Sequence, residues 1–342
     1  MEIALVAAEK GWLPDAVIRW GIRRLVASRH REEALKIRHG RTAQWIRSLE
    51  EAPVALATPE ANDQHYEVPP EFFQRCLGTH LKYSGCDWIN GAKTLSEAES
   101  ESLKLIGERA ELADGQRVLE LGCGWGSLSL WMATRYPLSH ITSVSNSSAQ
   151  REFIERKAEE RGLTNLTVLT RNMVEFEAED TFDRIVSVEM FEHMRNWPKL
   201  LGRCRNWLEP NGKLFLHVFA HRQFAYPFEG EDSSNWMARE FFTGGMMPSH
   251  ELLSHLDIPF TIDEAWLTSG EHYAQTAEAW LANIDQRRSE ALSIFERHYG
   301  ADAPRVVQRW RIFFMACAEL FGYRHGDEWG VSHHLLSANT EA

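Results

Sequence analysis

The stretch RVLELGCGWGSLSL at residues 117–130 decides the fold of this chain. Its first five residues are a short apolar run that predicts a buried strand, and the residues from Ser127 onward have the spacing of a helix. The glycines at 122, 124 and 126 suit a chain that turns tightly and brings its backbone close to a ligand. A plain tight turn also uses glycine, but the strand before the loop and the helix after it favour a ligand-binding loop.

Around this loop the sequence alternates between short apolar runs and amphipathic helices. Such alternation predicts crossover connections and a parallel, doubly wound α/β sheet. An apolar stripe over residues 306–321 keeps helical spacing and predicts a core helix, and another helix is expected near residues 276–299. The predicted strands are residues 117–121, 141–145, 166–169, 184–188, 214–219, 262–267 and 331–336.

The residues before the sheet are predicted to be helical and irregular. An amphipathic helix follows Pro14, and residues 50–64 form a linker without periodicity. Residues 65–88 are expected to be irregular. Ser96 and Glu99 then have the spacing of a capping box, which predicts the start of a further helix.

The spacing G-x-G-x-G resembles motif I of the class I methyltransferases that use S-adenosylmethionine (SAM) and release S-adenosylhomocysteine (SAH). In that motif an acidic residue ends the strand and the loop passes the methionine part of SAM, which implies that Glu120, Gly122 and Gly124 bind the cofactor. The second strand of such a unit usually ends in an acid for the ribose hydroxyls. Here Ser145 and Gln150 are the ribose candidates, with ordinary helix capping as the alternative.

The segment FDRIVSVEMFEHMRNW at residues 182–197 resembles the cyclopropane-fatty-acid synthase superfamily, and most closely its coclaurine N-methyltransferase branch. The resemblance covers about residues 12 to 336 and implies a Rossmann-like class I methyltransferase fold, with a helical N-terminal region and a lid inserted after the fifth strand. Further matching segments follow in order: ANDQHYEVPPEFF (61–73), LKYSGCDW (81–88), LGCGWGSLSL (121–130), FAYPFEGEDSSNW (224–236), FFTGGMMPS (241–249), EHYAQTAEAW (271–280) and AELFGY (318–323).

On this basis the chain divides into five parts. They are an N-terminal helical region and linker (1–64), a cofactor-covering helical segment (65–112), a Rossmann-like SAM-binding core (113–221), a lid and substrate insertion (222–260), and the C-terminal part of the sheet with its helices (261–342).

The resemblance also assigns cofactor residues away from the glycine loop. Tyr66, Tyr83 and Ser84 correspond to residues that close over SAM from the N-terminal side, with turn and packing roles as the alternative. Asn172 follows the third strand, where a residue facing the adenine amino group is expected. Many methyltransferases have aspartate at that place, so Asn172 is a departure.

Glu189, Glu192 and His193 match the acceptor site of the N-methyltransferase branch and follow the fourth strand, at the edge where open sheets bind ligands. An amine of pKa near 10 is about one part in 1000 free base at pH 7, a penalty of roughly 4 kcal/mol. A carboxylate pair can hold the ammonium, and a neutral histidine can take its proton. The alternative is structural, with Glu192 capping a helix and His193 packing beneath it.

The sequence also departs from the lipid-modifying members of that superfamily. Cyclopropane synthases hold a bicarbonate ion with a cysteine directly after a Tyr-Ser pair, a glutamate, a histidine and a tyrosine. Glu192, His217 and Tyr273 match three of these residues, but Gly85 follows the Tyr-Ser pair and Cys86 is displaced by one position. The departure disfavours lipid cyclopropanation.

These residues predict SAM-dependent N-methylation of a small amine. Aromatic residues near the expected pocket favour an aromatic, alkaloid-like amine: Phe241, Phe242, Trp266 and Trp329. His217 and Tyr273 are also assigned to substrate binding. One alternative is cyclopropanation or C-methylation of phospholipid acyl chains, and another is a non-catalytic SAM-binding protein.

The composition restricts the partners. A net charge of −12 argues against nucleic acid, which demands a basic face. The helix after Pro14 is basic and is expected to dock on the body of the protein, with contact to a membrane surface as the alternative. Self-association into a homo-oligomer is left open. The five cysteines are scattered without a C-x-x-C pair, so neither a disulfide framework nor a metal site is indicated. No apolar stretch reaches the roughly 20 residues of a membrane span and no signal peptide is seen, so a cytoplasmic protein is expected.

Overall fold

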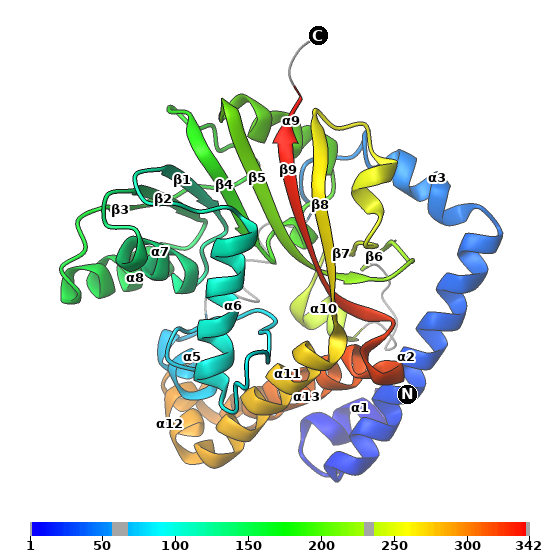
Figure 1. The fold of residues 1–342 in the computed structure, drawn as a ribbon. Helices are drawn as coiled ribbons and strands as arrows, with labels where there is room; N and C mark the ends of the chain where they lie inside the picture. The colour runs from blue at the N-terminus through cyan, green and yellow to red at the C-terminus, as the bar shows by residue number, and fades with distance from the viewer. Residues whose placement is uncertain (1, 57–67, 229–235, 340–342) are drawn as a thin grey trace.

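The computed structural model describes residues 2–56, 68–228 and 236–339 (Figure 1). Among these residues, seven strands form one sheet in the order β3-β2-β1-β4-β5-β9-β8. The strands from β3 to β5 pair in parallel, and β9 runs antiparallel to both of its neighbours. This sheet confirms the predicted α/β class. Its strands are β1 (Arg117–Leu121), β2 (His140–Ser145), β3 (Leu166–Thr170), β4 (Phe182–Val188), β5 (Leu208–His221), β8 (Phe260–Ser269) and β9 (Trp329–Ala338).

The helices fall into two groups. The helices that flank the parallel half of the sheet are α6 (Leu95–Arg109), α7 (Ser127–Arg135), α8 (Ser148–Glu160) and α9 (Trp197–Asn206). The others gather below and beside the sheet (Figure 1): α1 (Glu2–Glu9), α2 (Asp15–Arg38), α3 (Arg41–Ser48), α5 (Pro70–Cys76), α10 (Trp236–Phe241), α11 (Gly270–Gln286), α12 (Arg288–Tyr299) and α13 (Ala303–Phe321). After β5 the chain also forms the short pair β6 (Tyr226–Pro227) and β7 (Met246–Met247).

Two predicted helix boundaries were wrong. The helix expected near residues 276–299 is two helices, α11 and α12, which meet at Arg287, where φ is −111° and ψ is 30°. The capping box of α6 is formed by Thr94 and Glu97, not by Ser96 and Glu99. The carboxylate of Glu99 instead accepts backbone N–H groups of the preceding loop.

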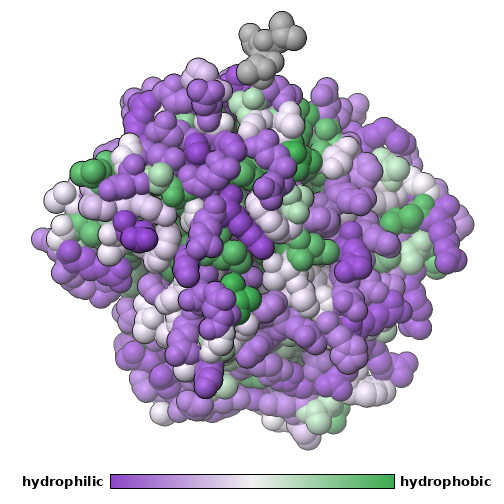
Figure 2. Space-filling model, viewed as in Figure 1, coloured by the Kyte–Doolittle hydropathy of each residue, from purple (hydrophilic) through white to green (hydrophobic). Residues whose placement is uncertain are grey.

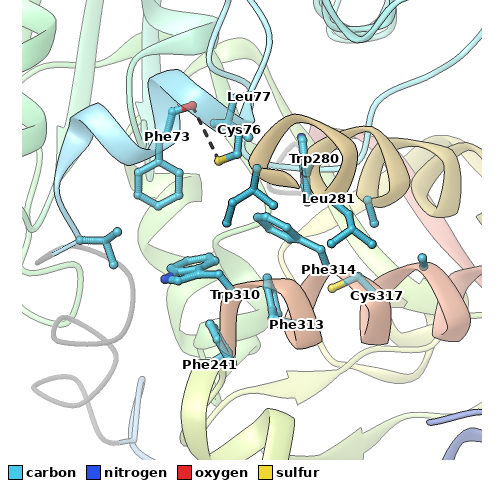
Figure 3. Packing of buried hydrophobic residues seen from close by; sticks show 14 of the residues in the cluster. Phe73, Cys76, Leu77, Phe241, Trp280, Leu281, Trp310, Phe313, Phe314 and Cys317 are labelled. Atoms are coloured by element: carbon cyan, nitrogen blue, oxygen red, sulfur yellow. Dashed lines mark hydrogen bonds between the residues drawn. The ribbon is translucent and has the colours of Figure 1, made fainter. Parts of the chain in front are cut away.

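The helical stripe predicted at residues 306–321 is the centre of the core in Figure 3. Trp310, Phe314 and Cys317 of α13 face Trp280 of α11, and the Phe73 ring of α5 packs against Trp310 at a centroid distance of 5.7 Å. Since α5 belongs to a segment predicted to be irregular, its apolar residues were missed as a helix. Phe73 also packs against Trp125 of the glycine loop at a centroid distance of 5.3 Å, so this aromatic core lies next to that loop.

Helix α2 is docked on the body, as predicted. Its residues Ile18 and Val26 are buried. Arg19 of the helix forms an ion pair with Glu278 of α11 at 2.6 Å, and Asp15 forms one with Arg311 of α13 at 2.6 Å. The opposite face of the helix remains open to solvent. No helix among the described residues has the length and apolar character needed to cross a membrane.

Candidate active site

A pocket lies at the carboxyl ends of β1, β2 and β4. Its walls come from the glycine loop after β1, the turn after β2, the segment after β4, the loop before α6 and two side chains of α11. The residues predicted to bind cofactor or acceptor that line it are Tyr83, Ser84, Glu120, Gly122, Gly124, Ser145, Gln150, Asn172, Glu189, His193, Phe242 and Tyr273.

The glycine loop turns with three residues in the left-handed region, Gly122, Gly124 and Gly126. A Cβ on Gly122 would lie 2.7 Å from the Cβ of Met190, so the close approach of Met190 leaves room only for glycine here. A Cβ on Gly124 would meet no atom within 4 Å, and since Gly124 lines the pocket, it would enter open pocket space. The loop therefore leaves room for a ligand at Gly124, which fits the predicted passage of the methionine part of SAM.

Glu120 ends β1 in a buried position. Its Oε2 accepts hydrogen bonds from Ser129 of α7 and, at 2.8 Å, from Ser143 of β2. Burial raises the pKa of Glu120 to about 7, and the two hydroxyl donors oppose that rise. The carboxyl is held rigidly at the floor of the loop.

The two ribose candidates bond to one another. Ser145 donates its hydroxyl to Oε1 of Gln150 at 2.7 Å, and both line the pocket. The N-cap of α8 is Ser147, which accepts the N–H of Gln150 at 3.3 Å. Asn172 also lines the pocket, where its Oδ1 accepts the N–H of Val174 at 3.0 Å. Polar side chains at the ends of β2 and β3 therefore border the space next to the glycine loop, which fits a cofactor with ribose hydroxyls and an adenine amino group such as SAM.

Glu189 is the most heavily bonded acid of the pocket. It follows β4 in the left-handed region, with φ of 48°. Its Oε1 accepts the N–H of Gly85 at 2.9 Å and lies 3.3 Å from Nε2 of His217. Its Oε2 accepts the hydroxyl of Tyr273 at 2.8 Å. Donors from the loop before α6, from β5 and from α11 thus converge on one carboxylate.

Lys82 stands beside this carboxylate and was missed by sequence reasoning. The residue is buried, and its Nζ donates to Oγ of Ser84 at 2.7 Å and to the carbonyl of Gly85. Burial raises the pKa of Glu189, while the charge of Lys82 and the hydrogen bonds from Gly85 and Tyr273 oppose the rise. The only sequence signal was a lysine within the matching segment at 81–88.

Glu192 has a different environment. It is fully buried and does not line the pocket. Its Oε1 accepts the N–H of Phe219 at 2.7 Å, and within the described residues its Oε2 has no hydrogen-bond partner. Burial and the nearby charge of Glu189 raise the pKa of Glu192 far above its usual range. Of the carboxylate pair expected from the sequence, Glu189 is therefore the better stabilised as an anion, and burial favours the neutral form of Glu192 more strongly.

His193 and Phe242 form one wall of the pocket. Their rings are stacked, with centroids 5.5 Å apart and an interplanar angle of 15°. His193 ends the short 3-10 helix η1 (Phe191–His193), and Phe242 follows α10. The segments after β4 and after β5 thus meet at this histidine.

Several predicted site residues lie away from the pocket. His217 is completely buried behind Glu189, and Phe241 stacks on Phe313 in the core with centroids 4.1 Å apart. Trp329 starts β9, where its Nε1 donates to the hydroxyl of Tyr226 at 3.1 Å. Trp266 lies beside Arg109, with the guanidinium 4.8 Å from the indole centroid. Tyr66 lies outside the described residues.

A second cluster of titratable groups joins α2 to the ends of β5 and β9. Ligand-type atoms of His30, His221 and Glu328 lie within 4.8 Å of one another. Nδ1 of His221 accepts the backbone N–H groups of Gln223 and Phe224, both at 2.9 Å. Because Nδ1 is an acceptor, the neutral ring carries its proton on Nε2 and has no lone pair there for a cation. The cluster is therefore explained as contacts between helix and sheet, in which Glu328 lies 3.1 Å from Nε2 of His30 and 3.7 Å from Nε2 of His221.

The comparisons with known proteins agree with this geometry. The family model described as mycolic acid cyclopropane synthetase matches residues 57–329. The chain belongs to this family. Within it, the (S)-coclaurine N-methyltransferase of Thalictrum flavum subsp. glaucum is 36% identical over 96% of this chain and 93% of its own length. The cyclopropane-fatty-acyl-phospholipid synthase of Escherichia coli (strain K12) is 30% identical over 73% of this chain and 66% of its own length.

A solved structure shows that the similarity extends over the whole fold. The crystal structure of coclaurine N-methyltransferase bound to N-methylheliamine and SAH superimposes with a TM-score of 0.91 at 34% identity. The match covers 97% of this chain and 98% of the other. The resemblance inferred from the sequence motifs is confirmed.

Proposed function

We propose that this chain is a SAM-dependent methyltransferase that transfers a methyl group to the nitrogen of a small, aromatic, alkaloid-like amine. The observation that carries the proposal is the Glu189 carboxylate, which borders the pocket and is held by donors from Gly85, His217 and Tyr273. Coclaurine N-methyltransferases share more than 90% of their length with this chain, and a solved member holds SAH and a methylated amine.

Glu189 supplies the charge that binds the acceptor. An aliphatic amine reaches the pocket as an ammonium, which has no lone pair for attack. The carboxylate of Glu189 accepts a charge-assisted hydrogen bond from the ammonium and fixes its orientation. Glu192 is buried behind the pocket wall, and its raised pKa favours the neutral form, so that Glu189 has no second negative charge beside it.

His193 is placed to take the proton. It lines the same pocket, and its stacking on Phe242 holds the imidazole plane. Removal of the ammonium proton by a neutral imidazole exposes the nitrogen lone pair, a contribution of roughly 100-fold or more. Gly122, Gly124, Ser145 and Gln150 would hold SAM, which supplies the methyl group on a sulfonium. The remaining acceleration comes from alignment of the reacting groups.

The walls favour an aromatic acceptor. Besides Phe242, the pocket is lined by the rings of Phe219, Trp280 and Phe313. Ring-to-ring contacts of this kind contribute about 0.5 to 1.5 kcal/mol beyond the area they bury. A Cβ at position 85 would lie 2.8 Å from Cδ1 of Tyr273, so a cysteine there would need that ring to move. The site therefore lacks room for the cysteine of the lipid-cyclopropanating mechanism.

The experiment is a competition between the two acceptor classes. Purified protein and SAM are incubated with aromatic secondary amines or with phospholipid vesicles, and the products are identified by mass spectrometry. Methylated amine with stoichiometric SAH is expected. A mass gain confined to the lipid acyl chains would replace the proposal by lipid modification. If SAH formed with neither class of acceptor, the acceptor assignment would be wrong.

We also propose that the open face of α2 contacts a partner surface. Val17, Trp20 and Leu35 are exposed there at 47%, 59% and 52%, and Arg24 covers the Trp20 ring at 4.9 Å. Apolar and basic side chains on one helix face suit an anionic membrane surface, and a second copy of the chain is the other partner to be tested. The cytoplasmic location expected from the sequence stays a prediction.

A further inference from the structure

A line of hydrogen-bonded side chains runs from the edge of the molecule to Glu189. Arg109, the last residue of α6, places Nη1 2.6 Å from Nδ1 of His333 on β9. Nε2 of His333 lies 2.8 Å from Nδ1 of His217 on β5. Nε2 of His217 lies 3.3 Å from Oε1 of Glu189. The two histidines face one another directly in the antiparallel ladder of β5 and β9.

The two ends of this line determine where every proton lies. A guanidinium can only donate, so Nδ1 of His333 is an acceptor and its Nε2 carries the hydrogen. That Nε2–H is donated to Nδ1 of His217, which places the hydrogen of His217 on its own Nε2. An ionised carboxylate can only accept, so the last N–H is donated to Glu189. Each ring exists as a single tautomer, and all the donors face the same way.

We propose that Arg109 and His333 are positioning residues for methyl transfer, because they hold His217 in the tautomer that donates Nε2–H to Glu189. The inference rests on the role proposed above for Glu189. Without His333, the His217 ring could carry its hydrogen on Nδ1 and present a lone pair to the carboxylate, which would repel it. The distant arginine therefore decides whether one of the donors on Glu189 exists.

The burial of the line supports this role. His217 and His333 are fully buried, and burial, with the charges of Lys82 and Arg109, lowers the pKa of both rings well below the usual range. Both are therefore neutral, and a neutral ring has two tautomers between which a partner must choose. Trp266 packs on the guanidinium of Arg109 at 4.8 Å and fixes its position.

The charged and titratable groups around Glu189 come from five elements. They are Lys82 and the buried Cys86 thiol from the loop before α6, Tyr273 from α11, His217 from β5, Glu192 from η1 and the buried Cys317 thiol from α13. Lys82 and the donors favour the carboxylate, while burial opposes it. Loss of the His217 donor therefore moves the balance toward protonated Glu189 and weakens ammonium binding at low pH.

The tautomers can be measured without any activity. Protein labelled with ¹⁵N-histidine is studied by NMR between about pH 6 and 8, where an unperturbed histidine would change its charge. We expect both His217 and His333 to keep the Nε2–H tautomer throughout this range. A ring of either residue that is charged, or protonated on Nδ1, would overturn the proposal. This result is independent of whether the acceptor is an amine.

The kinetic test compares variants of neighbouring histidines. His333→Phe keeps the ring shape without its nitrogens, and we expect the acid limb of kcat/KM to move up by about one pH unit. At high pH the variant should approach the parent. His333→Gln retains an amide donor toward His217 and should restore the limb. His334→Phe is the matched control, because His334 is equally buried on β9 but bonds to Ser332.

An unmoved acid limb in folded His333→Phe, or an equal shift in His334→Phe, would contradict the proposal. Where His333→Phe does not fold, Arg109→Met replaces it, with Arg109→Lys as the variant that retains a donor. Methyl transfer that survives intact in Glu189→Gln would instead refute the proposed function, while the tautomer measurement would still decide the hydrogen-bonded line.

Discussion

Glu189 and Glu192 are three positions apart, yet their surroundings differ in how well they stabilise a negative charge. Glu189 is stabilised as an anion by several donors, whereas Glu192 has one backbone donor and a buried oxygen without a partner among the described residues. Sequence reasoning treated them as a pair that holds the cation together. The structure separates the two roles.

Glu189→Gln should therefore lower kcat/KM by about 100-fold or more, because the ammonium loses a buried, hydrogen-bonded counter-charge. Glu192→Gln should lower it by less than about 10-fold, since the glutamine carbonyl can still accept the N–H of Phe219 and no charge is lost. Steady-state kinetics of the two variants, with SAM affinity by calorimetry, provides the comparison. Equal losses would mean that Glu192 is also ionised.

His193→Ala should lose roughly 100-fold in turnover at neutral pH, because the ammonium proton then has no general base. Raising the pH supplies free amine from solution, so part of the loss should be recovered between about pH 7 and 9. The pH profile of kcat is the measurement, and SAM affinity should stay constant. A loss that is the same at every pH would mean that His193 only shapes the pocket and is not the general base.

Gly124→Val should abolish SAM binding, because its side chain would enter pocket space that is open at present. Gly115→Val is the matched control. Gly115 also has a positive φ, of 87°, and open space around its Cβ position, but it lies outside the pocket. Both variants therefore carry the same kind of backbone strain, but only Gly124→Val fills the pocket. Comparable SAM affinities in calorimetric titrations of both would remove the cofactor assignment.

At the scale of elements, the site is made where the loop before α6, the end of β4, β5 and α11 meet. The donors that these elements provide are already bonded to Glu189. A free bicarbonate ion would have to compete with that carboxylate for the same donors and would be repelled by its charge. We therefore expect turnover to be unchanged when bicarbonate is removed, as measured in buffers purged of carbon dioxide. Restoration of a lost rate by added bicarbonate would favour the lipid-type mechanism.

The elements also show how far sequence reasoning reaches. β1 has the predicted bounds, because a buried parallel strand is a short apolar run with a glycine directly after it. β5 begins at Leu208, six residues before the predicted start at 214, where Leu208 pairs with Phe182 across an irregularity in the ladder. Such a pairing depends on the neighbouring strand and leaves no local signal.

The same limit applies to the site. The glycine loop and Glu189 were identified because each lies within a contiguous motif. Lys82, Arg109 and His333 were not, since they are far apart in the chain and only the order of strands brings them together. His217 was recognised, but as a substrate residue rather than as the donor behind Glu189. A single sequence does not show which elements far apart in the chain come into contact.

For the molecule as a whole, charge and apolar surface are unevenly distributed. The chain carries a net charge of −12, but its first fifty residues hold ten basic and six acidic side chains. Figure 2 shows a largely hydrophilic face, broken by small hydrophobic patches. Most of the large apolar side chains that are exposed belong to α1, α2 and the turn between them: Ile3, Val6, Trp12, Val17, Trp20, Leu25, Leu35 and Ile37.

We therefore expect the protein to sediment with vesicles of anionic lipid at low salt and not with zwitterionic ones. Trp20→Glu with Leu35→Glu should abolish sedimentation without loss of methyl transfer to a soluble amine. Light scattering of both proteins provides the second readout. A parent that is dimeric without lipid, and a variant that is monomeric, would identify the face as a contact between copies of the chain.

The position of β9 has a consequence for how the protein is made. β9 follows every other described element along the chain, yet it fills the place between β5 and β8. While the chain emerges from the ribosome, β5 and β8 therefore both present unpaired backbone edges, which invite association with other chains. The strand that finally covers these edges also carries His333. Closure of the sheet therefore also completes the hydrogen-bonded line from Arg109 to Glu189.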